Sequence, residues 1–181
     1  MSDEEEVYEE IVEDGRIQLC FDIIKDAYYF TFKNRDNLNE KASKIIVFSG
    51  IIVSLYSGLG GIILKDISKT DIISINKYYL LLFILVAGLI SLIISILLAL
   101  VAFKPEAWLS VPSPSVFMEK YARSNKSKYE ILGPLTSTMA DTISKNDGKN
   151  IKKAKYIQYS LYPLVLGLVI SVIFIIASLL I

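Results

Sequence analysis

The fold is decided by the stretch YYLLLFILVAGLISLIISILLALVAF (residues 78–103), which contains no Asp, Glu, Lys, Arg or His. About 20 apolar residues in a helix cross the roughly 30 Å hydrocarbon core of a bilayer. Two further runs share this property: IIVFSGIIVSLYSGLGGIIL (45–64) and YIQYSLYPLVLGLVISVIFIIASLLI (156–181). We therefore expect an all-α protein with three transmembrane helices.

The composition of the chain agrees with a membrane protein. Of its 181 residues, 53% are hydrophobic, and these are concentrated in the three runs. A buried core helix is the alternative for such a run, but the length without charge favours a span. A β-barrel is excluded because its strands are short and alternate in polarity. Since the first 44 residues are polar, we expect no cleavable signal peptide and expect the first span to direct its own insertion.

The distribution of basic residues predicts the topology. Residues 1–44 and 104–155 together hold 16 of the 19 Lys and Arg, whereas the connection 65–77 holds 3. Basic segments stay in the cytoplasm. We therefore expect a multi-pass protein of the cell membrane, with the N-terminus and the segment 104–155 in the cytoplasm. The loop 65–77 and the C-terminus then lie outside.

A cytoplasmic helix is predicted to lead into the first span. Residues 1–15 are acidic and are expected to be flexible, with Gly15 as the boundary. Between residues 16 and 49 the sequence has no Gly or Pro, which favours one helix from 16–44 into the span. Alternate steps of four and three residues give a coiled-coil-like apolar seam, interrupted at Thr31 and Arg35. Its apolar members are Ile17, Phe21, Ile24, Tyr28 and Leu38.

A second seam precedes the third span and contains Leu132, Leu135, Met139 and Ile143. We expect the two seam helices to form an antiparallel cytoplasmic bundle. The sequence SKNDGKN (144–150) allows a kink or break in the second helix instead. A short helix is also expected at 116–124. A continuous first helix makes mechanical coupling between cytoplasm and membrane possible, while a passive stalk is the alternative.

Small residues recur along the predicted spans, where they let helix backbones approach closely. They predict a tight three-helix bundle or a homo-oligomer. The helix-packing candidates are Gly50, Ser54, Gly58 and Gly61 in the first span, Ala87, Ser91, Ser95 and Ala99 in the second, and Gly167 and Ser171 in the third. A pore would have to form in an oligomer, lined by Ser54, Ser57, Ser91 or Ser95.

Catalytic, metal and cofactor sites are not indicated. The chain has no His and a single Cys, Cys20, so zinc sites and His-dependent triads are excluded within this chain. No Gly-rich phosphate loop is present. We expect a protein that is not an enzyme, has no cofactor and binds no nucleic acid. Lys149, Lys152, Lys153 and Lys155 precede the third span and are expected to contact anionic lipid head groups.

Three segments carry a family resemblance: FDIIKDAYYFTFKNRDNLNEKASKIIVFSGIIVSL (21–55), AFKPEAW (102–108) and ISKNDGKNIKKAKYIQYSLYPLVLGL (143–168). They resemble a family of small prokaryotic three-span membrane proteins, in which a helix with a Lys-Ala pair, here Lys41 and Ala42, enters the first span. That family is similar to the transmembrane effector of the Pycsar cyclic-pyrimidine antiphage systems and, more remotely, to SLATT-type membrane effectors. The resemblance implies a cytoplasmic helical module that senses a signal and spans that oligomerise or compromise the bilayer.

Two functions are therefore expected from different classes. The first is an oligomeric effector or sensor whose cytoplasmic helices receive a protein or cyclic-nucleotide signal and alter the membrane. The second is a structural or assembly subunit of a membrane complex whose cytoplasmic helices dock a partner protein.

Overall fold

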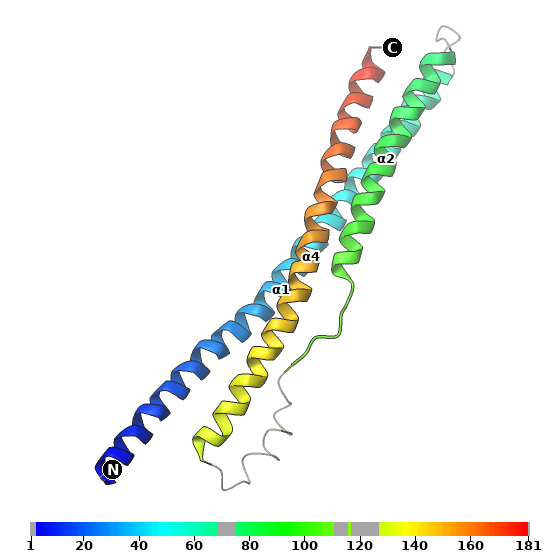
Figure 1. Cartoon of the computed structure of the whole chain (residues 1–181). Helices are drawn as coiled ribbons and strands as arrows, with labels where there is room; N and C mark the ends of the chain where they lie inside the picture. Colours follow the sequence, from blue (N-terminus) through cyan, green and yellow to red (C-terminus); the bar gives the residue numbers. More distant parts are fainter. Residues whose placement is uncertain (1–2, 69–74, 111–115, 117–126, 181) are drawn as a thin grey trace. The chain divides into compact units, whose positions relative to one another are not determined.

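The computed structural model describes residues 3–68, 75–110, 116 and 127–180, without the side chains of 3–14, 66–68 and 75. These residues form three long α-helices: α1 Asp3–Ser68, α2 Ile75–Phe103 and α4 Lys128–Leu179 (Figure 1). Each is long and apolar enough to cross a membrane. The all-α fold of three long, packed helices is confirmed and indicates a multi-pass membrane protein. The short helix expected at 116–124 lies outside the described residues.

Helix α1 is unbroken from Asp3, so its backbone passes through Gly15, where a boundary was expected. Acidic residues in a first helical turn interact favourably with the helix dipole, and an internal Gly costs only about 1 kcal/mol relative to Ala. The acidic segment is thus helical rather than separate from the helix that follows.

Helix α4 is likewise unbroken through Asp147 and Gly148, which rules out the break considered at SKNDGKN (144–150). No described glycine has a positive φ angle, so Gly148 keeps a helical backbone conformation. The helix also continues through Pro163, where the proline ring removes the amide that would donate to the Tyr159 carbonyl.

The chain divides into two compact units. Met1–Asp36 and Glu106–Ile151 form one unit, which we call the polar unit. Asn37–Pro105 and Lys152–Ile181 form the other, which we call the span unit.

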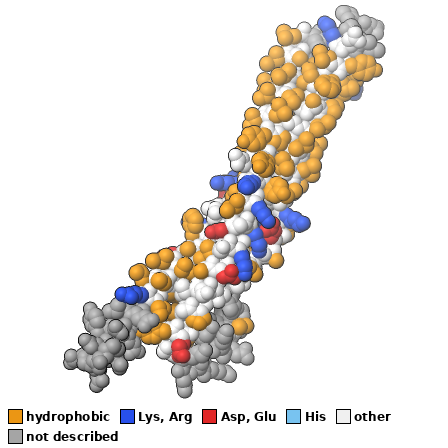
Figure 2. Space-filling model, viewed as in Figure 1, with side chains coloured by type: hydrophobic (Ala, Val, Ile, Leu, Met, Phe, Trp, Pro, Cys, Tyr) orange, Lys and Arg blue, Asp and Glu red, His pale blue; other side chains and the backbone are white. Residues whose placement is uncertain are grey.

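Three helices build the span unit, and its core consists of apolar side chains with several buried serines. The Tyr56 ring of α1 packs edge-on against Phe174 of α4, with 5.4 Å between ring centroids. The Tyr56 hydroxyl donates to the Ile84 carbonyl of α2 at 3.3 Å. The apolar side chains with no exposed surface come from all three helices: Ala42, Leu81, Leu92, Ala99 and Phe174. The visible outer surface of these helices is covered by hydrophobic side chains, as a lipid environment requires (Figure 2).

Contacts within the span unit give the helix directions. Asn39 contacts Lys153 and Tyr56 contacts Phe174, so residue numbers rise together along α1 and α4, which are parallel. Helix α2 is antiparallel to both, because Ser91 bonds to Pro163 whereas Ser95, one turn later in α2, bonds to Ser160, which is earlier in α4.

The antiparallel arrangement expected for the two seam helices is therefore wrong for this pair. Within the polar unit, α1 and α4 also run in the same direction (Figure 1). The physical reason is that each seam lies N-terminal to the span it leads into, so both helices point toward their spans. The antiparallel member of the bundle is α2.

Two glycines of the span unit allow close helix approach. A Cβ atom at Gly88 would lie 2.7 Å from the Tyr56 ring, and one at Gly167 would lie 2.7 Å from Leu92 Cγ. Contacts this short do not occur in real side-chain packing, so a larger residue would force the neighbouring side chain to move. Gly88 thus lets α2 pack closely against α1, and Gly167 lets α4 pack closely against α2.

Candidate functional site

A short non-helical segment after α2 forms the most distinctive site of the polar unit. We call residues 106–110 the strap. The side chain of Asn146, which is fully buried in α4, bonds to both backbone groups of Leu109. Its Oδ1 accepts from the Leu109 N–H at 3.3 Å, and its Nδ2 donates to the Leu109 carbonyl at 2.9 Å. Backbone groups that leave water need such partners, so Asn146 fixes the strap on α4.

Trp108 anchors the strap through its ring. The ring lies 5.8 Å from the ring of Phe32 on α1. The guanidinium of Arg35 lies 5.1 Å from the centroid of the Trp108 ring, and the ammonium of Lys149 lies 5.9 Å from it. Cations at this range are attracted to the negative face of an indole. Lys149 also donates a hydrogen bond to the Ala107 carbonyl, so the same lysine holds the strap by two contacts.

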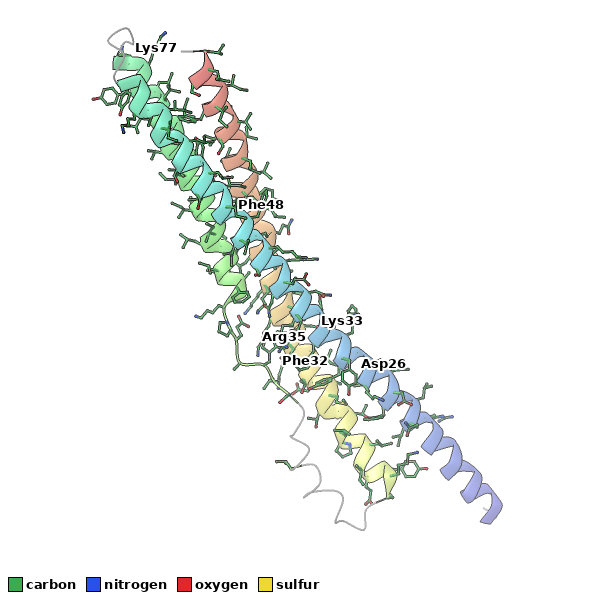
Figure 3. All side chains as sticks on the ribbon, turned by 180° about the vertical axis from the view of Figure 1, so that it is seen from behind. Asp26, Phe32, Lys33, Arg35, Phe48 and Lys77 are labelled. Atoms are coloured by element: carbon green, nitrogen blue, oxygen red, sulfur yellow. The ribbon has the colours of Figure 1, made fainter. Side chains whose placement is uncertain are left out.

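Neighbouring side chains of α1 hold the Arg35 guanidinium in place. Its guanidinium is 5.2 Å from the Phe32 ring and bonds to the Asp36 carboxylate at 2.9 Å. Phe32 and Arg35 lie together beside the strap (Figure 3). Lys33, which directly follows Phe32 in the helix, is exposed. The strap therefore contacts α1 and α4 at once and ties these two helices of the polar unit together.

The direct contact between α1 and α4 beside the strap is polar. The Thr31 hydroxyl donates to Asp147 Oδ1 at 3.2 Å, and Asn150 Nδ2 donates to the Thr31 carbonyl at 3.1 Å. Thr31 and Asn150 are each 3% exposed. Asn150 Oδ1 is buried without a hydrogen-bond partner. An unsatisfied buried acceptor costs about 1–3 kcal/mol, so this helix pairing carries a penalty.

The predicted seam residues lie on partly buried helix faces. Leu38 and Met139 are buried. The others are half-buried: Ile17, Phe21, Ile24, Tyr28, Leu132, Leu135 and Ile143. Between residues 144 and 157 of α4 the buried side chains are Asn146, Asn150, Lys153 and Ile157, whereas Ala154 is exposed.

The four lysines expected at lipid head groups occupy different environments. Lys152 and Lys155 are exposed, and Lys149 contacts the strap. Lys153 is 4% exposed, and its ammonium donates to Asn39 Oδ1 at 2.9 Å within the span unit. Lys153 thus lies between helices α1 and α4 rather than on an outward face.

The small residues divide into two groups. Ser91, Ser95, Ala99, Gly167 and Ser171 are buried in the span unit, and Ala87 is half-buried. On α1, by contrast, a Cβ atom at Gly50, Gly58 or Gly61 would meet nothing within 4 Å, and Ser54 is exposed. The packing role of the α1 stripe in a homo-oligomer therefore stays a prediction. Sequence reasoning missed Gly60 and Gly88, which do contact α2 and α1, because small size alone does not reveal which side of a helix faces its neighbour.

Two observations bear on chemistry. Among the described residues, no three His, Cys, Asp or Glu side chains are grouped so that they could hold a metal ion. Cys20 is exposed on α1.

Comparison of the chain with known protein families, with curated proteins and with solved structures finds no match.

Proposed function

We propose that the protein is a non-enzymatic, oligomeric membrane effector in which the polar unit receives a cytoplasmic signal and the spans alter the membrane in response. The observation that carries this proposal is the clamp of Asn146 on Leu109 together with the cation-flanked Trp108. The strap joins two helices that each continue into a candidate span. Release of the strap by a ligand would therefore act on both helices, as a sensor requires.

The strength of the strap contacts supports reversible release. Each hydrogen bond from Asn146 contributes about 0.5–1.5 kcal/mol net, and each cation–π contact about 0.5–1 kcal/mol at a half-exposed site. Together the two hydrogen bonds and the two cation–π contacts amount to about 2–5 kcal/mol. A ligand that favours one state by about 5.5 kcal/mol converts a 1:99 mixture into 99:1, so binding energy of ordinary size is sufficient to release the strap.

The orientation belongs to the same proposal. The polar unit lies in the cytoplasm because the basic residues of 1–44 and 104–155 resist translocation. The signal is a cytoplasmic protein or a cyclic nucleotide. The second of these rests on the resemblance of 21–55, 102–108 and 143–168 to the Pycsar-type effector family.

Dye leakage from liposomes that contain the purified protein tests the proposal. A panel of cyclic nucleotides is added on the side of the polar unit, and the same panel is added to empty liposomes as the control. Leakage triggered by one nucleotide only when the protein is present supports the effector and names its signal. If no nucleotide causes leakage although the protein is folded and correctly oriented, a cyclic-nucleotide signal is contradicted and the docking of a partner protein is favoured.

The second function is a subunit that docks a cytoplasmic partner protein and leaves the bilayer intact. One observation favours it. Leu19, Ile23 and Phe30 of α1 are 62%, 59% and 68% exposed in the polar unit, outside the long apolar runs. Apolar side chains grouped on an exposed surface are typical of protein interaction sites. Leakage without any partner protein would contradict this function.

A further inference from the structure

We propose that Ser91 and Ser95 of α2 lock a hinge in α4 at Pro163, and that release of these two hydroxyl groups lets the segment 164–179 change its tilt within the span unit. This inference does not depend on the signal or on the effector function.

The hinge arises from the chemistry of proline. Pro163 has no N–H, so the Tyr159 carbonyl loses its usual donor in the next turn of α4. Sharp bends in helices occur mostly at such positions. Helix α4 nevertheless continues to Leu179, so another part of the span unit must support it at this turn.

Two hydroxyl groups provide this support from α2. The Ser95 hydroxyl donates to the Ser160 carbonyl at 2.8 Å, on the N-terminal side of the proline. The Ser91 hydroxyl donates to the carbonyl of Pro163 itself, also at 2.8 Å. Ser91 and Ser95 are one helical turn apart and are 6% and 0% exposed. They thus bracket the weakened turn of α4 where water has no access to replace them.

Other serines of the span unit behave differently. The hydroxyl groups of five of them donate to carbonyls of their own helix, three or four residues earlier: Ser54, Ser57, Ser160, Ser171 and Ser178. Such local bonding is the usual choice of a serine in a helix. The buried Ser49 hydroxyl has no hydrogen-bond partner. Ser91 and Ser95 instead donate hydrogen bonds to a neighbouring helix. Their acceptors, Pro163 and Ser160, both lie in residues 160–163 of α4.

Beyond the hinge, the Ser171 hydroxyl contacts the Tyr56 hydroxyl of α1, and the other contacts described for this segment are apolar. In the described contacts, Gly167 packs against Leu92 and Phe174 packs against Tyr56. Apolar packing of this kind has little preference over lipid tails, because lipid is as apolar as the side chains. The two hydroxyl bonds therefore contribute much of the preference for the closed position of 164–179.

Spin-label distance measurements in liposomes test the inference. In a Cys20→Ser background, labels replace the exposed residues Phe83 and Ile176, which report the segment beyond the hinge. A second pair replaces the exposed residues Leu97 and Tyr156, which report α4 before the hinge. The variant S91A/S95A is compared with S178A, which removes a hydrogen bond from Ser178 to the Ile175 carbonyl within α4.

The inference predicts one narrow distance distribution for both pairs in the starting protein and in S178A. In S91A/S95A the 83–176 pair should gain a second population, while the 97–156 pair should stay unchanged. Each lost interhelical bond should raise the second population about threefold to tenfold. Adding P163A to S91A/S95A should restore the narrow distribution, because a regular helix needs no lock.

Two results would overturn the inference. One is an 83–176 distribution in S91A/S95A that matches the starting protein. The other is a broad distribution that persists after P163A is added, which would mean that the serines only pack the helices. If S91A/S95A does not insert, S91A alone carries the same comparison, and S91T, which keeps the hydroxyl, should behave as the starting protein.

Discussion

Replacement of Asn146 by Ala tests the strap most sharply. The side chain is fully buried and makes two hydrogen bonds with Leu109. Loss of two bonds at about 0.5–1.5 kcal/mol each weakens docking of the strap by about 1–3 kcal/mol. Since 1.4 kcal/mol corresponds to a factor of ten, the undocked fraction should rise about 5-fold to 150-fold.

The assay uses the intrinsic fluorescence of Trp108, which is the single tryptophan of the chain. In N146A we expect the emission to shift to longer wavelength and acrylamide quenching to increase, because the indole loses Phe32, Arg35 and Lys149. Helix content measured by circular dichroism should stay the same. Asn37→Ala is the matched control, since Asn37 is an exposed asparagine of α1. Emission and quenching in N146A equal to those of N37A would refute the role of Asn146.

Three further predictions concern oligomerisation, topology and charge. Gly58→Ile should reduce the oligomer size in detergent, whereas Gly58→Ala should leave it unchanged. Since nothing in the same chain lies within 4 Å of a Cβ atom at Gly58, an effect of the larger side chain would come from contact with another copy. An unchanged oligomer size in G58I would exclude the α1 stripe as an interface. An impermeant thiol reagent should label Cys20 only after lysis and denaturation, and labelling in intact cells would reverse the proposed orientation. Lys44, by its hydrogen bond and its charge, lowers the pKa of Glu40, so Lys44→Ala should raise that pKa toward its ordinary value in an NMR titration. This exposed pair stabilises the fold at pH values above the ordinary carboxyl pKa, and the stabilisation is lost as the pH falls through the lowered pKa of Glu40. A Glu40 titration in K44A that is the same as in the unaltered protein would contradict the contact.

The spans could be predicted from the sequence because a membrane imposes one strong requirement. Every residue of 78–103 is uncharged, and no ordinary soluble helix keeps such a run. Ser91 and Ser95 were expected at helix contacts and are buried, but Ser54, in the similar stripe of α1, is exposed. The acceptors of Ser91 and Ser95 could not be predicted, because the carbonyls of Ser160 and Pro163 are more than sixty residues away in the chain.

The strap could not be predicted for a similar reason. Asn146 and Leu109 are 37 residues apart, and a single buried amide leaves no periodic pattern in a sequence. Periodicity identifies a buried face but not its partner or direction, which is how the two seam helices came to be expected as antiparallel. Lys153 shows the same limit, because a lysine among exposed lysines gives no sign that it is the buried one.

The central claim is that docking of the strap in the polar unit controls the effect of the spans on the bilayer. Dye leakage from liposomes containing N146A, without any added ligand, tests it most directly, with N37A and the unaltered protein in parallel. The account predicts spontaneous leakage from N146A and intact liposomes with the other two. Intact liposomes with folded, inserted N146A, in a sample whose Trp108 fluorescence shows an undocked strap, would contradict it.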